Sequence, residues 1–205
     1  MIRLRRRIMR VIMVVGVSLA LGGGAIAWIV YNRGDEVPPW NDNTFWDAFA
    51  AKGIKEYAAL LNSGSAREAQ EYFDKVDTAL EVGSEPPDEK AEAEGYEKYL
   101  KRLLYFRENT VGPGKYVADV LKRTIIFKDR IGNYADTVDE CDRSMSRIEA
   151  GFGSNSPSVA SALTSCGYAL KQTGDDLRGD AFLSRARQIR DSRRVPMRSK
   201  HAEEK

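Results

Sequence analysis

The sequence predicts an all-α protein, with one N-terminal transmembrane helix followed by a soluble bundle of about six helices arranged in helical hairpins. Residues 11–31 carry no charge, and 21 residues at ~1.5 Å each match a hydrocarbon core of ~30 Å. After this segment the apolar residues recur at helical spacing, and only very short stretches alternate as a strand would. The composition, 42% hydrophobic and 30% charged, is that of a folded chain.

The apolar segment allows two interpretations. Ala25-Ile26-Ala27 has the form of a signal-peptide cleavage site, which would release the rest of the chain. However, the apolar run continues to Tyr31, and Trp28 and Tyr31 lie where the aromatic belt of a membrane helix is expected. We therefore expect an uncleaved single-pass signal-anchor.

Charge predicts the orientation of this anchor. Five arginines lie in the basic segment 1–10, and such residues are held on the inner side of the membrane. The expected location is an inner membrane, either the bacterial plasma membrane or the mitochondrial inner membrane. The main domain would then lie in the periplasm or the intermembrane space. The expected order after the anchor is a linker at 32–43, a helical domain at 44–190 and a basic tail at 191–205.

Small residues form a stripe along the predicted membrane helix. Because residues four apart share a helix face, this stripe would let another membrane helix approach closely. Glycine is also common in membrane helices, and consecutive glycines can mark a flexible point. We favour a helix interface formed by Gly16, Ala20, Gly23, Gly24 and Ala27.

The first soluble helix is expected over 44–62, ended by Ser63-Gly64. Ser65 and Glu68 then have the spacing of a capping box for a second helix, which would form an antiparallel hairpin with the first. The first helix and the linker before it are rich in aromatic residues. As a candidate surface for a protein partner we select Trp40, Phe45, Trp46 and Phe49.

A third helix is expected to end at the sequence NTVGPG. The fourth is predicted to be one long helix, because apolar residues from Val117 to Ile148 alternate steps of three and four without interruption. This seam fits the central helix of a bundle or an intermolecular coiled coil, and we favour the bundle. Ser156 and Pro157 begin a fifth helix, and Gly174 separates it from a sixth that ends near Arg190.

The last two helices resemble a tetratricopeptide repeat in the spacing of their small and apolar residues. The matching positions, within 163–186, are Leu163, Gly167, Leu170, Gly174, Gly179, Leu183 and Ala186. Gly64, Ala69 and Phe73, within 64–73, match the second half of the repeat, whereas Gly53 fits its first helix poorly. The resemblance implies a scaffold that binds peptides or proteins.

Two cysteines lie on predicted buried faces of consecutive helices. Cys141 and Cys166 are each about ten residues from the turn near 151–155, so antiparallel packing brings them to the same level. In an oxidising compartment they would form a disulfide, and the alternative is two buried free thiols.

The sequence carries no recognisable catalytic, cofactor or metal motif. The single histidine, His201, lies in the charged tail, and two cysteines cannot supply a structural zinc site with it. Residues 33–184 carry 19 Lys/Arg against 27 Asp/Glu, an acidic balance that argues against nucleic acid as a partner. We expect no enzyme, no cofactor and no small-molecule substrate.

Two functions remain open. The chain is expected to be a non-catalytic accessory or scaffolding subunit that binds the other subunits of a larger membrane complex. The alternative is a membrane-tethered adaptor whose tetratricopeptide-like hairpins bind a peptide or client protein.

Overall fold

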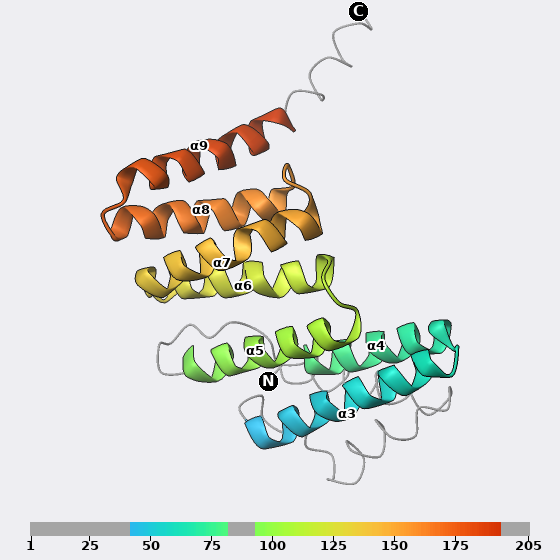
Figure 1. Ribbon diagram of the computed structural model, residues 1–205. Helices are drawn as coiled ribbons and strands as arrows, with labels where there is room; N and C mark the ends of the chain where they lie inside the picture. The colour runs from blue at the N-terminus through green and yellow to red at the C-terminus, as the bar shows by residue number, and fades with distance from the viewer. Residues whose placement is uncertain (1–41, 82–92, 194–205) are drawn as a thin grey trace, which may run out of the picture. The chain divides into compact units, whose positions relative to one another are not determined.

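The computed structural model describes residues 42–81 and 93–193, and all the regular structure in these ranges is α-helical (Figure 1). The seven helices are α3 (Asn43–Asn62), α4 (Ala66–Leu80), α5 (Ala93–Thr110), α6 (Lys115–Arg130), α7 (Tyr134–Phe152), α8 (Pro157–Gln172) and α9 (Asp176–Ser192). The segment expected to be one helical domain divides into two compact units, with the boundary between Thr110 and Val111.

None of the helices within 42–81 and 93–193 is both long and apolar enough to cross a membrane. The predicted transmembrane helix at 11–31 lies outside the described residues. So does its stripe, formed by Gly16, Ala20, Gly23, Gly24 and Ala27.

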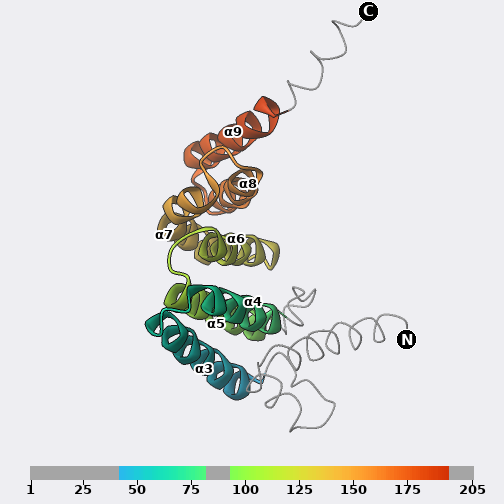
Figure 2. The same cartoon turned by 90° about the vertical axis from the view of Figure 1, so that its right-hand side faces the viewer.

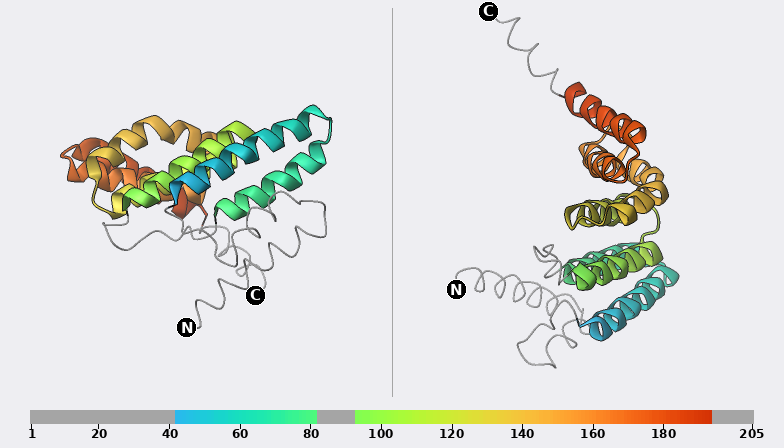
Figure 3. Two further views of the ribbon diagram at one scale, coloured as in Figure 1. Left: turned by 90° about the horizontal axis from the view of Figure 1, so that it is seen from below. Right: turned by 90° about the vertical axis from the view of Figure 1, so that its left-hand side faces the viewer.

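The first unit contains α3, α4 and α5, and α5 packs mainly against α3 (Figure 3). As predicted, α3 and α4 form a hairpin, and the backbone turns at Gly64, whose φ of 81° suits glycine. The core is aromatic where the three helices meet: Phe73 of α4 stacks on Phe106 of α5 with ring centroids 5.6 Å apart. Phe106 also reaches Gly53 of α3, where an added Cβ would lie 3.1 Å from its ring.

The predicted capping box at Ser65 does not form. Ser65 makes no side-chain hydrogen bond to the start of α4, and its backbone has ψ 60° rather than the extended conformation of most N-caps. Ser156 is extended, with ψ 153°, and its hydroxyl accepts a hydrogen bond from the N–H of Val159. Asp175 has ψ 68° but still accepts from the N–H of Arg178. At this backbone angle the longer Asp side chain caps the helix, whereas serine does not.

The long fourth helix expected over 117–148 is two helices, α6 and α7, so that prediction was wrong. Gly132 adopts φ 77°, and the N–H groups of Gly132 and Asn133 donate to the carbonyls of Asp129 and Lys128. This is the Schellman arrangement that ends a helix at a left-handed glycine. The apolar seam continues across the turn because both helices bury their apolar faces within the same unit, so an intermolecular coiled coil along one straight helix is excluded.

The second unit contains α6 to α9 as two hairpins, with α8 packed between α9 and the α6–α7 hairpin (Figure 2). Helix α8 contacts α6, α7 and α9, and nine of its sixteen residues are buried. Most of these nine residues are small, which lets the neighbouring helices approach closely. Gly167 and Gly179 bring the backbones of α8 and α9 together: a Cβ on Gly179 would lie 2.9 Å from the carbonyl oxygen of Gly167. Both glycines are among the positions that resemble a tetratricopeptide repeat, and they lie where α8 and α9 cross.

We expect Gly179→Ala to lower the free energy of unfolding by about 1–2 kcal/mol. Alanine gains about 1 kcal/mol of helix propensity over glycine, but overpacking at 2.9 Å from a fixed backbone carbonyl costs about 2–3 kcal/mol, the upper part of the usual range. Urea unfolding followed by circular dichroism measures the change. Ser184→Ala, at an exposed position of the same helix, is the control and should change stability by less than about 0.5 kcal/mol. A Gly179→Ala protein as stable as the parent would contradict the close backbone contact.

Candidate functional site

The aromatic surface selected from the sequence is mostly core. Trp46 and Phe49 are only 6% and 5% exposed, so the prediction that they face a partner was wrong. They are buried because α5 packs on α3, a contact between distant segments that helical spacing alone does not reveal. Phe45 is half-buried, with its ring centroid 5.0 Å from that of Trp46, and Trp40 lies outside the described residues.

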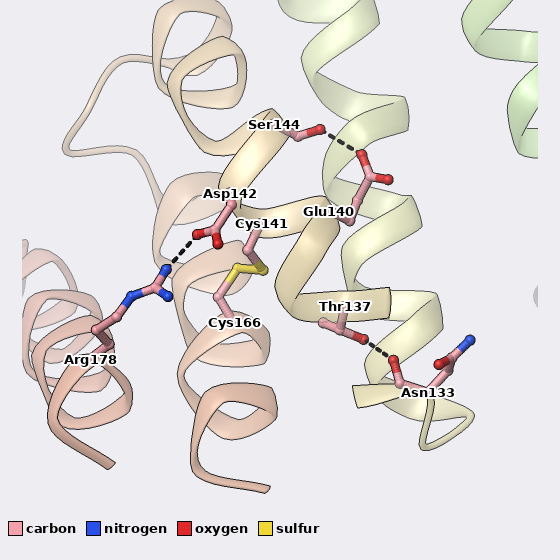
Figure 4. Close-up of a disulfide and its surroundings, with 8 residues drawn as sticks. All are labelled: Asn133, Thr137, Glu140, Cys141, Asp142, Ser144, Cys166 and Arg178. Atoms are coloured by element: carbon pink, nitrogen blue, oxygen red, sulfur yellow. Dashed lines mark hydrogen bonds and ion pairs between the residues drawn. A yellow bond between two sulfur atoms is a disulfide. The ribbon is translucent and has the colours of Figure 1, made fainter. Parts of the chain in front are cut away.

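A disulfide joins Cys141 of α7 to Cys166 of α8, so the two hairpins of the second unit are covalently linked (Figure 4). Their Cα atoms lie 5.9 Å apart, and the two residues are 2% and 0% exposed. The pairing expected from their equal distances to the intervening turn is present in the structure. Disulfides of this kind persist in oxidising compartments.

Two ion pairs connect α7 to α9 on the outside of the same unit. Arg178 binds Asp142 beside the disulfide (Figure 4). Seven residues further along both helices, Arg185 Nη1 lies 2.7 Å from Glu149 Oε1. The hydrogen bond from Arg185 lowers the pKa of Glu149 despite partial burial of the carboxyl group. These two pairs, which are seven residues apart on both helices, connect α9 to α7 through side chains, whereas α9 packs against α8.

We expect Glu149→Gln to lower the free energy of unfolding by about 0.5–1 kcal/mol at neutral pH. The effect is small because the Arg185–Glu149 pair is only partly shielded from water. The folded pKa is lowered, so the stabilisation is present above the unfolded pKa of ~4.3 and is lost as pH falls through the folded value. Urea unfolding at pH 7 and at pH 3 should therefore show a difference from the parent only at pH 7. Asp139→Asn, at an exposed position of the same helix, is the control. An equal cost at both pH values would contradict an electrostatic origin.

One side of α8 remains accessible after its three neighbours are accounted for. Ser165 hydrogen-bonds Asp129 of α6, Cys166 binds α7, and Gly167 meets α9. At ~100° per residue the remaining side centres on Tyr168, which is 53% exposed. We call this side the α8 outer face, and it comprises Ser161, Thr164, Tyr168, Lys171 and Gln172. It offers one aromatic ring bordered by polar side chains, of which Ser161 and Thr164 bond to carbonyls of α8 and Lys171 pairs with Asp180 of α9.

The second unit carries a short internal repeat that the spacing of apolar residues did not indicate. An offset of 42 residues, as from Gly132 to Gly174, aligns the sequences VADVL and VASAL at the start of α6 and α8. The aligned residues share their environment: both turn glycines have positive φ, and the aligned Val, Ala and Leu side chains are buried, namely Val117, Ala118, Leu121, Val159, Ala160 and Leu163. By this alignment Ile126, which is half-buried, takes the place of Tyr168 on α6. The two hairpins of the second unit therefore share the pattern of their first helix and of their turn.

The described residues contain no cluster of His, Cys, Asp and Glu side chains placed to hold a metal ion. Their strongest charge cluster is Arg107 with Asp77 and Glu81 in the first unit, and its side chains bind one another. Among the accessible surfaces of the described helices, the α8 outer face is the best defined. Comparisons of the chain with protein-family models, with curated proteins and with solved structures find no match.

Proposed function

We propose that this chain is a non-catalytic adaptor, tethered to a membrane by residues 11–31, whose helical hairpins bind a segment of another protein. The observation that carries the proposal is the α8 outer face. Tyr168 stands exposed at its centre, on a helix fixed by a disulfide and by neighbours on three sides. An aromatic ring on a rigid helix supplies contact area at low entropic cost, and the polar residues around it supply orientation.

The location is part of the same proposal. An inner membrane with the helical units on its outer side, in a periplasm or intermembrane space, suits the Cys141–Cys166 disulfide, because thiols in the cytosol are kept reduced. The proposal requires no cofactor, small-molecule substrate or nucleic acid.

The exposed apolar residues favour a transient contact over a permanent one. Obligate interfaces bury large, contiguous hydrophobic surfaces. Within 42–81 and 93–193, the exposed large hydrophobic residues are spread over five helix positions: Leu61, Tyr105, Tyr116, Tyr168 and Leu177. Such a distribution suits a short bound segment better than a broad, permanent subunit interface.

The second candidate, an accessory subunit of a membrane complex, is supported by the small-residue stripe of the predicted membrane helix. Gly16, Ala20 and Gly24 share one helix face and would allow close docking of another membrane helix. In this alternative the permanent contact is within the membrane.

Site-specific photo-crosslinking in native membranes tests the adaptor. A photoreactive residue at position 168 should give one discrete protein adduct, and one at position 105 on α5 should not. Tyr168→Ala should weaken capture of that partner by about 10-fold, as for loss of a central aromatic contact worth about 1–2 kcal/mol. Absence of an adduct at 168 would refute the adaptor.

Native sizing in mild detergent separates the two candidates. Co-migration with a large complex in fixed ratio, lost when Gly16, Ala20 and Gly24 are replaced by leucine but retained in Tyr168→Ala, would establish the accessory subunit instead. Migration unaffected by the leucine replacements, with capture that depends on Tyr168, would support the adaptor.

A further inference from the structure

The two units differ in how their cores are built. Among the described residues of the first unit seven aromatic residues are buried: Trp46, Phe49, Tyr57, Phe73, Tyr96, Tyr99 and Phe106. In the described part of the second unit, Phe127 is the one buried aromatic residue. The described core of the first unit is therefore richer in large aromatic side chains than that of the second.

The buried residues of α7 and α9 are mostly small. Met145 and Ile148 are the large ones on α7, beside Thr137, Cys141 and Ser144, and those of α9 are Gly179, Ala186 and Ile189. Small residues allow close helix approach, but each buries little apolar area. At the position equivalent to Cys141, 42 residues later, α9 has the larger Leu183. Cys141 is buried, whereas Leu183 is half-buried.

The cysteine pair is also fully enclosed. At 2% and 0% exposure, neither sulfur-bearing residue is open to a dissolved reagent while α7 and α8 are packed together. Access to the disulfide thus requires opening of the same contact that the disulfide holds closed.

We propose that the Cys141–Cys166 disulfide is a redox-dependent lock on the second unit. In the disulfide form it keeps the α6–α7 and α8–α9 hairpins together, and in the dithiol form these hairpins separate far more often, while the first unit keeps its structure. Cleavage needs a dithiol reductant: one thiolate attacks a sulfur to form a mixed disulfide, and the second displaces it. The products are the two cysteine thiols and the oxidised reductant.

The size of the effect follows from the closed loop. The cysteines are 25 residues apart, and the loop-closure entropy for that length corresponds to about a 300-fold change in the equilibrium between the folded second unit and a form in which α7 and α8 are unfolded. The disulfide lies wholly within the second unit, so the effect should be confined to residues after 110.

Hydrogen exchange with mass spectrometry on the full chain, in detergent, tests the lock. The chain is reduced by dithiothreitol, in urea if required, and returned to native buffer before exchange. Amides of α6–α9 should lose protection by about 300-fold, and those of α3–α5 should change by less than threefold. Protection in α6–α9 that falls by less than threefold, or an equal loss in both units, would overturn the proposal.

Two variants separate the covalent link from packing. Cys141→Ala/Cys166→Ala should lack protection in the second unit with or without reductant. Cys141→Val/Cys166→Ala, which fills the core position with an aliphatic side chain, should recover part of that protection and should not respond to dithiothreitol. A variant that lacks both cysteines yet matches the oxidised parent would also overturn the proposal.

Discussion

Replacement of Asp77 by alanine is expected to lower the free energy of unfolding of the first unit by about 3–5 kcal/mol, because it removes the carboxylate that binds both Nε and Nη2 of a buried arginine. Arg107 Nε and Nη2 donate to the two carboxylate oxygens of Asp77 at 2.7 and 2.9 Å, and Nη2 also donates to Glu81 at 2.6 Å. The Arg107 side chain is 4% exposed and that of Asp77 is 12% exposed. Burial alone would lower the pKa of Arg107, but its bonds to Asp77 and Glu81 outweigh burial and raise it.

Urea unfolding of the full chain, followed by hydrogen exchange of α3–α5, measures this loss. Glu71→Ala is the control, since it breaks the Arg67–Glu71 pair on the same helix, where the side chains are 92% and 47% exposed. That change should cost less than about 0.5 kcal/mol. Asp77→Leu with Arg107→Met should recover most of the stability, because it leaves no buried charge unpaired. A single Asp77→Ala protein within 1 kcal/mol of the parent would contradict this account.

This ion-pair cluster shows a limit of sequence analysis. In a sequence, charged residues at helical spacing indicate a solvated face, and α5 carries Arg102 and Arg107 among other charges. The structure buries both arginines, and Arg102 Nε lies 2.6 Å from Asp47 of α3. Each pairing links residues more than twenty positions apart, so it depends on how helices dock, which local spacing does not determine.

Features set by local geometry were predicted well. The turns at Gly64 and Gly174, the cap at Ser156 and the ends of α3 and α8 depend on residues within one helical turn. The disulfide was also predictable, because an antiparallel hairpin places residues at equal distances from its turn side by side. The break between α6 and α7 was missed although Gly132-Asn133 is a strong local stop signal. That pair falls between the seam residues Ile131 and Tyr134, so the apolar spacing continues across it.

The candidate site was the least predictable part. Aromatic residues at the start of the first unit were expected to face a partner, yet Trp46 and Phe49 became core once α5 covered α3. Tyr168 was not predicted to be part of a partner surface, because a single tyrosine on an otherwise buried helix has no distinctive spacing. The repeat of VADVL and VASAL aligns α8 with α6 but does not identify Tyr168 either, because the aligned Ile126 is half-buried.

Phe106→Ala is expected to lower the free energy of unfolding of the first unit by about 3–5 kcal/mol. The loss is similar in size to that at Asp77, but it comes from a cavity in the core and not from an unpaired charge. Phe106 is 0% exposed, stacks on Phe73 at an interplanar angle of 3° and lies against the site of Gly53. Its ring therefore touches α3 and α4 at once, and its removal leaves a cavity where all three helices meet. Unlike the loss at Asp77, this loss contains no electrostatic contribution, so it should change little between low and high salt.

Tyr105→Ala is the matched control, because Tyr105 is the neighbouring aromatic residue of α5 and is 54% exposed. It should cost less than about 0.5 kcal/mol under the same urea titration. Phe106→Leu, which retains most of the buried volume, should fall between the two. If Phe106→Ala and Tyr105→Ala were equally mild, α5 would contribute little to the core of the first unit, and the burial of Trp46 and Phe49 beneath it would need another explanation.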